Sequence, residues 1–219
     1  MQCTFILSQV RKKLNDPNAT AWTDVDALIP ALNEALQALA SYRPDAASIT
    51  AMMLLVAGTR QTLPSNGVRL LKVIRNRGVS GLSDAGRAIR KADMLIQDSF
   101  TPDWHEAEGQ TTVDEYFYDP LMPKEFYVYP PAPVSPIIGI DISYVRVLPT
   151  ITASSDTLPV DDYFAPALQE WMLYSIWCGD DEQNPNYAAA NAHLQTFFNL
   201  LQIKTASDMA TNPKAVKAE

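Results

Sequence analysis

The chain has 219 residues, 47% of them hydrophobic, and a formal net charge of −8 at pH 7. This length predicts a hydrophobic core in one or two domains, and this composition argues against a wholly disordered chain. No apolar run reaches the roughly 18 residues that span a bilayer, and the first residues lack a signal-peptide pattern, so we expect synthesis in the cytoplasm and no membrane contact. Cys3 and Cys178 lie far apart in the sequence and are expected to be reduced and buried.

The first elements predicted along the chain are two helices. Residues 5–14 form the first, and a second follows with Pro30 producing a kink near its first turn. The apolar positions of the second helix recur at helical spacing and are Leu28, Leu32, Leu36 and Leu39.

The middle of the chain carries the signals of β-strands separated by turns rich in Pro, Gly and Asn. The predicted strands are residues 49–56, 68–74, 112–118, 126–129 and 137–147, and residues 57–64 have a similar pattern. In the last strand, alternation of Ile and Tyr with Gly139, Asp141 and Ser143 predicts one buried face and one solvated face. We expect Pro130 and Pro131 to stop the aromatic strand before them, because proline donates no ladder hydrogen bond.

Helical spacing returns near Pro159, and a second helix begins at about 184–185, so the two are expected to form an αα-hairpin. After Thr205 the chain is small and polar, which is typical of a free tail or of an arm that binds a partner. The predicted fold is therefore α+β. Residues 1–47 and 157–204 form a helical bundle, residues 48–156 an inserted antiparallel β-sandwich or barrel-like domain, and residues 205–219 an extended, flexible C-terminal arm.

Charge is segregated along the sequence. Residues 69–91 hold seven basic residues against Asp84, whereas residues 147–203 hold seven acidic residues and no Lys or Arg. Two solvated faces would explain this pattern, and so would an assembly in which a basic surface meets the acidic surface of a neighbour. The candidate interface residues are Arg69, Lys72, Arg75, Arg77, Arg87, Arg90, Asp161, Asp162, Glu170, Asp180, Asp181 and Glu182.

Residue patterns that carry catalysis or hold cofactors are sparse. His105, with Asp103 or Glu106, could serve a small hydrolase, but neither His105 nor His193 has companions at metal-ligand spacing. The chain has no Gly-rich phosphate loop, so we expect no catalytic residue, no cofactor and no metal. The basic segment could contact phosphates, but the acidic chain and the absence of interleaved aromatic residues argue against tight DNA binding.

Several short motifs occur in an order that resembles one family. They include Val-Ala-Gly-Thr-Arg-Gln-Thr-Leu-Pro at 56–64, Pro-Asp-Trp at 102–104 and Pro-Lys-Glu-Phe-Tyr-Val-Tyr-Pro-Pro at 123–131. The others are residues 33–36, 42–46, 88–90 and 118–120 and the helix starts at 161–163 and 186–188. Over about residues 5–203, this series resembles the head-to-tail adaptor (connector) proteins of tailed bacteriophages.

The resemblance implies a structural virion protein, made in the bacterial host cytoplasm and placed at the head–tail junction. Such proteins commonly form a dodecameric ring under the portal protein, contact a tail tube or nozzle protein, and let genomic DNA pass through the lumen without specific binding. The resemblance also implies a C-terminal arm that reaches the portal, for which the candidates are Met209, Lys214, Val216 and Lys217.

Two tests and three alternatives accompany this interpretation. Reversing Arg75 and Arg77 to Glu is expected to impair ring formation, and deleting residues 205–219 is expected to spare folding but weaken portal docking. The alternatives are a tail-tube or tail-completion protein of the same virion, a small hydrolase that uses His105, and a carbohydrate-binding β module.

Overall fold

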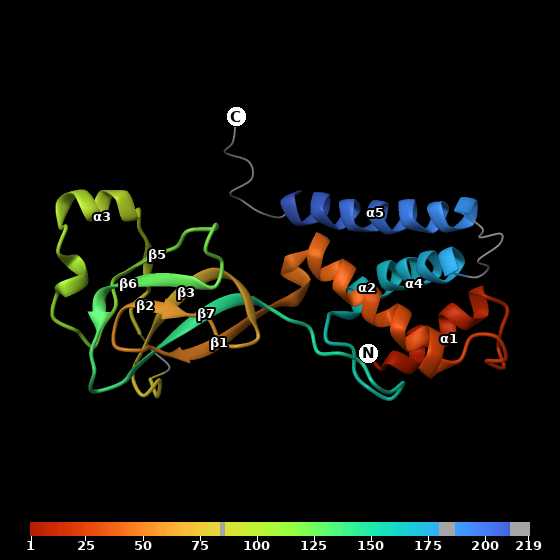
Figure 1. Cartoon of the computed structure of the whole chain (residues 1–219), viewed down its shortest axis with the longest axis horizontal. Helices are drawn as coiled ribbons and strands as arrows, with labels where there is room; N and C mark the ends of the chain where they lie inside the picture. Colours follow the sequence, from red (N-terminus) through yellow and green to blue (C-terminus); the bar gives the residue numbers. More distant parts are fainter. Residues whose placement is uncertain (84–85, 180–186, 211–219) are drawn as a thin grey trace. The chain divides into compact units, whose positions relative to one another are not determined.

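The chain divides into two compact units in the computed structural model, which describes residues 1–83, 86–179 and 187–210, the last eight of these by their backbone alone. The first unit comprises Met1–Ala46 and Leu148–Glu219, and the second comprises Ala47–Val147. Within the described residues the first unit is helical and the second holds two β-sheets (Figure 1). The predicted α+β class is therefore confirmed.

The helical unit contains four α-helices within its described residues. They are α1 (Cys3–Lys13), α2 (Ile29–Tyr42), α4 (Ala165–Gly179) and α5 (Tyr187–Ala210), with a short 3-10 turn, η4 (Asp162–Phe164), before α4. Helix α4 packs against α1, α2 and α5, and α5 runs alongside α4 (Figure 1). The core between them includes Ile6 of α1, Leu32 of α2, Leu168 of α4 and Phe197 of α5.

A π-helical turn lies at the start of α2, next to the kink predicted at Pro30. Residues Asp24–Leu28 form a π-helical turn, η1, and the Leu28 backbone N–H donates to the Thr23 carbonyl oxygen over 3.1 Å. Regular α2 then begins at Ile29, with Pro30 in its first turn, the part of a helix where proline is tolerated. The irregularity therefore precedes the proline.

Residues 148–156 belong to the helical unit rather than to the β domain in which the sequence analysis placed them. Ile151 is buried in the helical core, and its backbone exchanges two hydrogen bonds with the Asn33 side chain, of 2.8 and 2.9 Å. The Cys3 and Thr4 backbone N–H groups donate to the carbonyl oxygens of Asp156 and Ser154. These contacts bind the segment to α1 and α2.

Residues 205–210, predicted as the start of the C-terminal arm, belong to helix α5 instead. Helix α5 continues through residues 205–210 to Ala210, because Ala and Met extend a helix readily once it is nucleated. The remaining predicted arm, residues 211–219, lies outside the described residues.

Seven strands form two sheets in the described part of the second unit. Their bounds are β1 (Ser48–Leu54), β2 (Gly58–Thr62), β3 (Gly67–Val79), β4 (Arg90–Lys91), β5 (Glu115–Phe117), β6 (Glu125–Ala132) and β7 (Ile138–Arg146). The sheet orders are β1-β7-β3 and β2-β6-β5-β4, and neither described sheet closes into a barrel (Figure 1). Because β4 pairs with β5 in parallel, the second sheet is mixed rather than antiparallel as predicted.

Three short helical elements complete the second unit or lead into it. They are η2 (Pro44–Ala47), α3 (Met94–Phe100) and η3 (Trp104–Glu106).

Strand β6 differs from the prediction at its end. It continues through Pro130 and Pro131 to Ala132, which pairs with Gly58 of β2. Although the prolines donate no hydrogen bond, the Pro131 carbonyl oxygen still accepts one from the Gln110 backbone N–H over 2.9 Å. The pair of prolines therefore does not stop this strand.

Both sheets contribute to a single hydrophobic core. Val73 of β3 and Ile140 of β7 lie in the same cluster as Phe126 and Val128 of β6. Tyr127 alternates with them and is only half-buried, as the alternation along β6 predicts.

The two cysteines form no disulfide. Cys3 is buried, and burial raises the pKa of its thiol, as expected for a reduced core residue. Cys178 is only half-buried.

Candidate interaction surfaces

Arg75 and Arg77 of the candidate interface are bound inside the β unit. The Asp141 carboxylate on the central strand β7 is only 7% exposed, contrary to the solvated face predicted for it. Arg75 Nε lies 2.7 Å from Asp141 Oδ2, and Arg77 Nη1 lies 3.4 Å from Oδ1. A carboxylate at this depth requires a compensating positive charge, so these two arginines neutralise it.

Two further candidate cations are paired at the surface of the same unit. Arg87 Nη1 lies 2.9 Å from Asp114 Oδ1, and Arg90 Nη2 lies 2.8 Å from Glu115 Oε1. Both arginine side chains are mainly exposed, so each pair contributes at most about 1 kcal/mol to stability. The basic run of the sequence is therefore largely balanced by carboxylates of its own unit.

Arg69 and Lys72 remain as exposed cations on β3. Among the ion pairs found within the described residues, none includes either side chain. Burial raises the pKa of Tyr118, and the positive charge of Arg69 partly opposes that rise. These two residues are consequently the members of the basic set best able to meet a partner.

The candidate acidic residues are also partly engaged within the helical unit. Glu170 Oε1 lies 2.7 Å from Lys13 Nζ, and its Oε2 lies 2.7 Å from His193 Nδ1. Burial raises the pKa of Glu170, but the hydrogen bonds and charges of Lys13 and His193 outweigh this effect and hold it below its ordinary value.

The other acidic candidates lie at or beyond the ends of α4. Asp162 Oδ1 lies 2.7 Å from the Met1 ammonium group, and Asp161 is exposed at the start of η4. Asp180, Asp181 and Glu182 lie outside the described residues.

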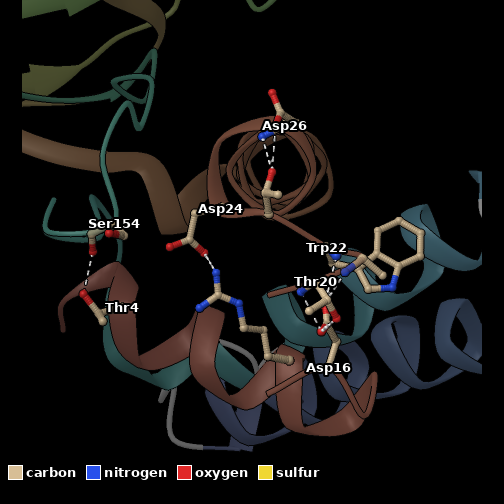
Figure 2. Close-up of polar contacts among 10 residues, drawn as sticks. Thr4, Asp16, Thr20, Trp22, Asp24, Asp26 and Ser154 are labelled. Carbon is tan, nitrogen blue, oxygen red and sulfur yellow. Dashed lines mark hydrogen bonds and ion pairs between the residues drawn. The ribbon is translucent and has the colours of Figure 1, made fainter. Parts of the chain in front are cut away.

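A polar network that the sequence analysis missed connects α1 to α2 (Figure 2). The Asp16 carboxylate accepts hydrogen bonds from the backbone N–H groups of Thr20, Ala21 and Trp22 and from the Thr20 hydroxyl, over 2.7–3.0 Å. These neutral donors, led by Trp22, hold the pKa of Asp16 far below its usual value. The sequence signal that could have predicted this loop is Asp16, which follows the end of α1 at Lys13 and precedes Thr20 by four residues.

The same network has two further parts. Arg11 Nη2 pairs with Asp24 Oδ1, which connects α1 to η1 (Figure 2). The Thr23 hydroxyl caps η1 by accepting from the Asp26 backbone N–H over 3.1 Å. Asp16, Asp24 and Asp26 therefore organise the loop that orients two helices.

His105 has a structural environment. Its Nδ1 lies 2.8 Å from Thr59 Oγ1, and its ring stacks on the buried Trp104 ring with centroids 3.7 Å apart. Trp104 Nε1 in turn donates to Asp98 Oδ1 over 2.8 Å. Within the described residues, the hydrogen bond of the His105 ring goes to a threonine hydroxyl rather than to the acid that a hydrolase would need.

The described residues contain no group of three or more His, Cys, Asp or Glu side chains that could hold a metal ion. No helix among them is both long enough and apolar enough to cross a bilayer.

The predicted arm residues are divided by the structure. Met209 lies in the last turn of α5 rather than in an extended arm, and its side chain is not described. Lys214, Val216 and Lys217 lie outside the described residues.

Comparison with known proteins decides the family. The model of the SU10 adaptor protein family matches residues 1–217. The chain belongs to the SU10 adaptor protein family. A search of curated proteins found no match. The family match confirms the resemblance to phage head-to-tail adaptors and extends it to nearly the whole chain.

Proposed function

We propose that this SU10 adaptor family member forms a dodecameric ring under the portal protein and joins the capsid to the tail. The ring would sit at the head–tail junction of the virion, contact a tail tube or nozzle protein below, and enclose a channel for DNA during ejection. The observation that carries this proposal is the family match over residues 1–217.

The distribution of charge supports a channel that does not hold DNA. The chain carries a net charge of −8, and Arg75, Arg77, Arg87 and Arg90 already face carboxylates of their own unit. Phosphate binding requires clustered cations that are free to replace counterions. An acidic lumen would instead repel the phosphates and let the genome slide.

We also infer two finer features of the fold. The two sheets form a sandwich, because Val73 and Ile140 of one sheet share a core with Phe126 and Val128 of the other. The helices form a bundle, because α4 packs against α1, α2 and α5.

We propose a structural rather than a catalytic role. His105 bonds to Thr59 and stacks on Trp104, which is an arrangement that holds a loop in place. Full particle assembly by a His105→Ala variant would agree with this role, and loss of a hydrolytic activity in that variant would contradict it.

The direct test is to mix the purified protein with its portal protein and to measure the mass of the complex. A mass that corresponds to a ring bound to the portal supports the proposal. A complex with a tail protein but none with the portal would favour the tail-tube or tail-completion alternative. Electron microscopy of the particle would then locate the ring.

Reversing Arg75 and Arg77 would not test whether the basic surface meets an acidic surface of a neighbour. Because those residues neutralise the buried Asp141, their reversal would damage the β unit and would not report on assembly. We propose that the exposed cations Arg69 and Lys72 meet acidic residues of a neighbouring subunit or of the portal. The variant R69E/K72E should lose ring or portal binding, and unchanged binding would refute this contact.

Deleting residues 205–219 would not test portal binding by the C-terminal arm alone. Removing residues from 205 onward would cut the last turns of α5, so the chain should instead end after Ala210. We propose that residues 211–219 contact the portal. Equal portal affinity of the full chain and the truncated chain would exclude this role.

A further inference from the structure

The β unit contains an open groove next to α3. Its cavity has a volume of about 640 Å³, with Phe117 and Tyr127 among its aromatic lining residues and Leu95 and Met122 among its aliphatic ones. The groove therefore belongs to α3, β5 and β6, which are labelled in Figure 1. A cavity of this volume accommodates several side chains of a ligand.

The groove is acidic. Asp93, Asp98 and Asp119 line it together with one ammonium group, that of Lys91. The hydrogen bonds of these aspartates come from neutral donors: the backbone N–H groups of Leu95 and Leu121 and the indole N–H of Trp104, over 2.8–2.9 Å. Within the described residues, no ion pair includes any of these three carboxylates, so no cation of the unit is paired with them.

The other two charged lining residues do not reverse this balance. Glu125 is matched by Arg60, whose Nε donates to Glu125 Oε2 over 3.0 Å. Lys91 Nζ lies 5.9 Å from the centre of the Tyr118 ring, at the distance of a cation–π contact. Among the charged lining residues, three carboxylates without an ion-pair partner in the described chain therefore face one ammonium group, that of Lys91.

Exposed apolar side chains continue beyond the cavity. No residue of α3 is buried, and Leu95 is 75% exposed. Leu121, which is next to the lining residue Met122, is 89% exposed. A small molecule in the cavity would leave these side chains in water, whereas a longer ligand could cover them.

We propose that this groove, called here the α3 groove, binds a peptide segment of another protein in which apolar side chains are flanked by Lys or Arg. The apolar side chains enter the cavity and cover Leu95 and Leu121, and the cations face Asp93, Asp98 and Asp119. Charge complementarity selects this occupant, because the same carboxylates repel nucleic acids and acidic segments. This inference requires neither ring formation nor portal binding.

The test uses the full chain and two short amidated peptides with identical Leu positions. One carries Lys at every other position, and the other carries Glu there. The Lys peptide should bind and shift the NMR signals of residues 91–98 and 117–127, whereas the Glu peptide should not. Binding of both with equal affinity, or of neither, overturns the proposal.

A pair of triple variants separates the groove from the overall negative charge of the chain. D93N/D98N/D119N keeps an acceptor oxygen at each position and should weaken Lys-peptide binding about tenfold. The control D103N/E106Q/E108Q removes three exposed charges of the same unit that do not line the groove, and should change the affinity less than about twofold. Equal weakening by both triple variants would mean that the peptide senses only net charge, and would refute the site.

Two further measurements cover folding and the apolar contribution. If the groove triple variant unfolds, D119N alone carries the charge test, with an expected loss of about twofold to threefold. Leu95→Ser should weaken the Lys–Leu peptide but not oligolysine, which lacks apolar side chains. Because the single chain is tested, a failed ring or portal experiment leaves these outcomes unchanged.

Discussion

The two units of this chain each bury an aspartate, and they stabilise its carboxylate differently. In the helical unit, Asp16 is 6% exposed and accepts hydrogen bonds from neutral backbone and hydroxyl donors. In the β unit, Asp141 is 7% exposed and faces two guanidinium groups. Within the described residues, the arrangement around Asp16 leaves its negative charge without a cation. In the β unit, Asp141 instead takes up positive charge of Arg75 and Arg77. The basic and acidic segments of the sequence therefore do not become equally basic and acidic surfaces.

The strongest way to break this comparison is to reverse both arginines in the β unit. R75E/R77E would place three carboxylates together, and we expect a loss of at least about 3 kcal/mol in the free energy of unfolding of that unit. Hydrogen exchange read out peptide by peptide would show the loss in strands β3 and β7. The control R87E/R90E breaks only exposed pairs and should cost less than about 1 kcal/mol per pair. Equal effects of the two variants would contradict our account of Asp141.

The matching change in the helical unit is Asp16→Ala. It leaves the N–H groups of Thr20, Ala21 and Trp22 without their acceptor, so the midpoint of thermal unfolding should fall by roughly 5 °C or more. Asp16→Asn keeps an acceptor oxygen and should have a smaller effect. If Asn and Ala lower the midpoint equally, the charge rather than the hydrogen bonds stabilises the loop.

Acid should destabilise the helical unit through three of its carboxyl groups. The helical unit contains Asp16, Asp156 and Glu170, whose pKa values lie below their ordinary values, chiefly through hydrogen bonds for the first two and through Lys13 and His193 for Glu170. A carboxyl with a lowered pKa stabilises the fold above its unfolded pKa of about 4, and this contribution is lost as the pH falls through the folded pKa. Hydrogen exchange in α1, α2 and α4 should therefore accelerate below about pH 4, and less steeply in Glu170→Gln. An identical pH profile in that variant would contradict this role of Glu170.

The smallest effect on stability is expected for R69E/K72E. Both side chains are exposed on β3, so the free energy of unfolding should stay within about 0.5 kcal/mol of the original. This makes the variant a clean test of assembly, since a lost interaction would not follow from unfolding. A large loss of stability would show that these cations, like Arg75 and Arg77, have partners within the fold.

Local patterns predicted much of the fold. The helical spacing of Leu32, Leu36 and Leu39 predicted an apolar face of α2, and all three side chains are buried, because residues three or four apart lie on one face of a helix. Turn and proline signals were less reliable. Pro130 and Pro131 stay within β6, where the Pro131 carbonyl oxygen still accepts a hydrogen bond from Gln110, and α5 extends past residue 205 because an existing helix propagates at little cost.

The candidate site was harder to predict than the fold, because its charges are paired by tertiary structure. Arg75 and Asp141 are 66 positions apart, and only the β3–β7 register makes them neighbours. The α3 groove likewise joins residues 91–98 to residues 117–127 across a loop.

The sequence by itself determined the α+β class, the main helices and strands and the family resemblance, because these depend on spacing and motif order within short segments. Tertiary structure alone decided which of the charged residues remain available to a partner. The physical reason is that the free energy of a charge depends on its burial and on its nearest opposite charge, and both are set by residues distant in the chain.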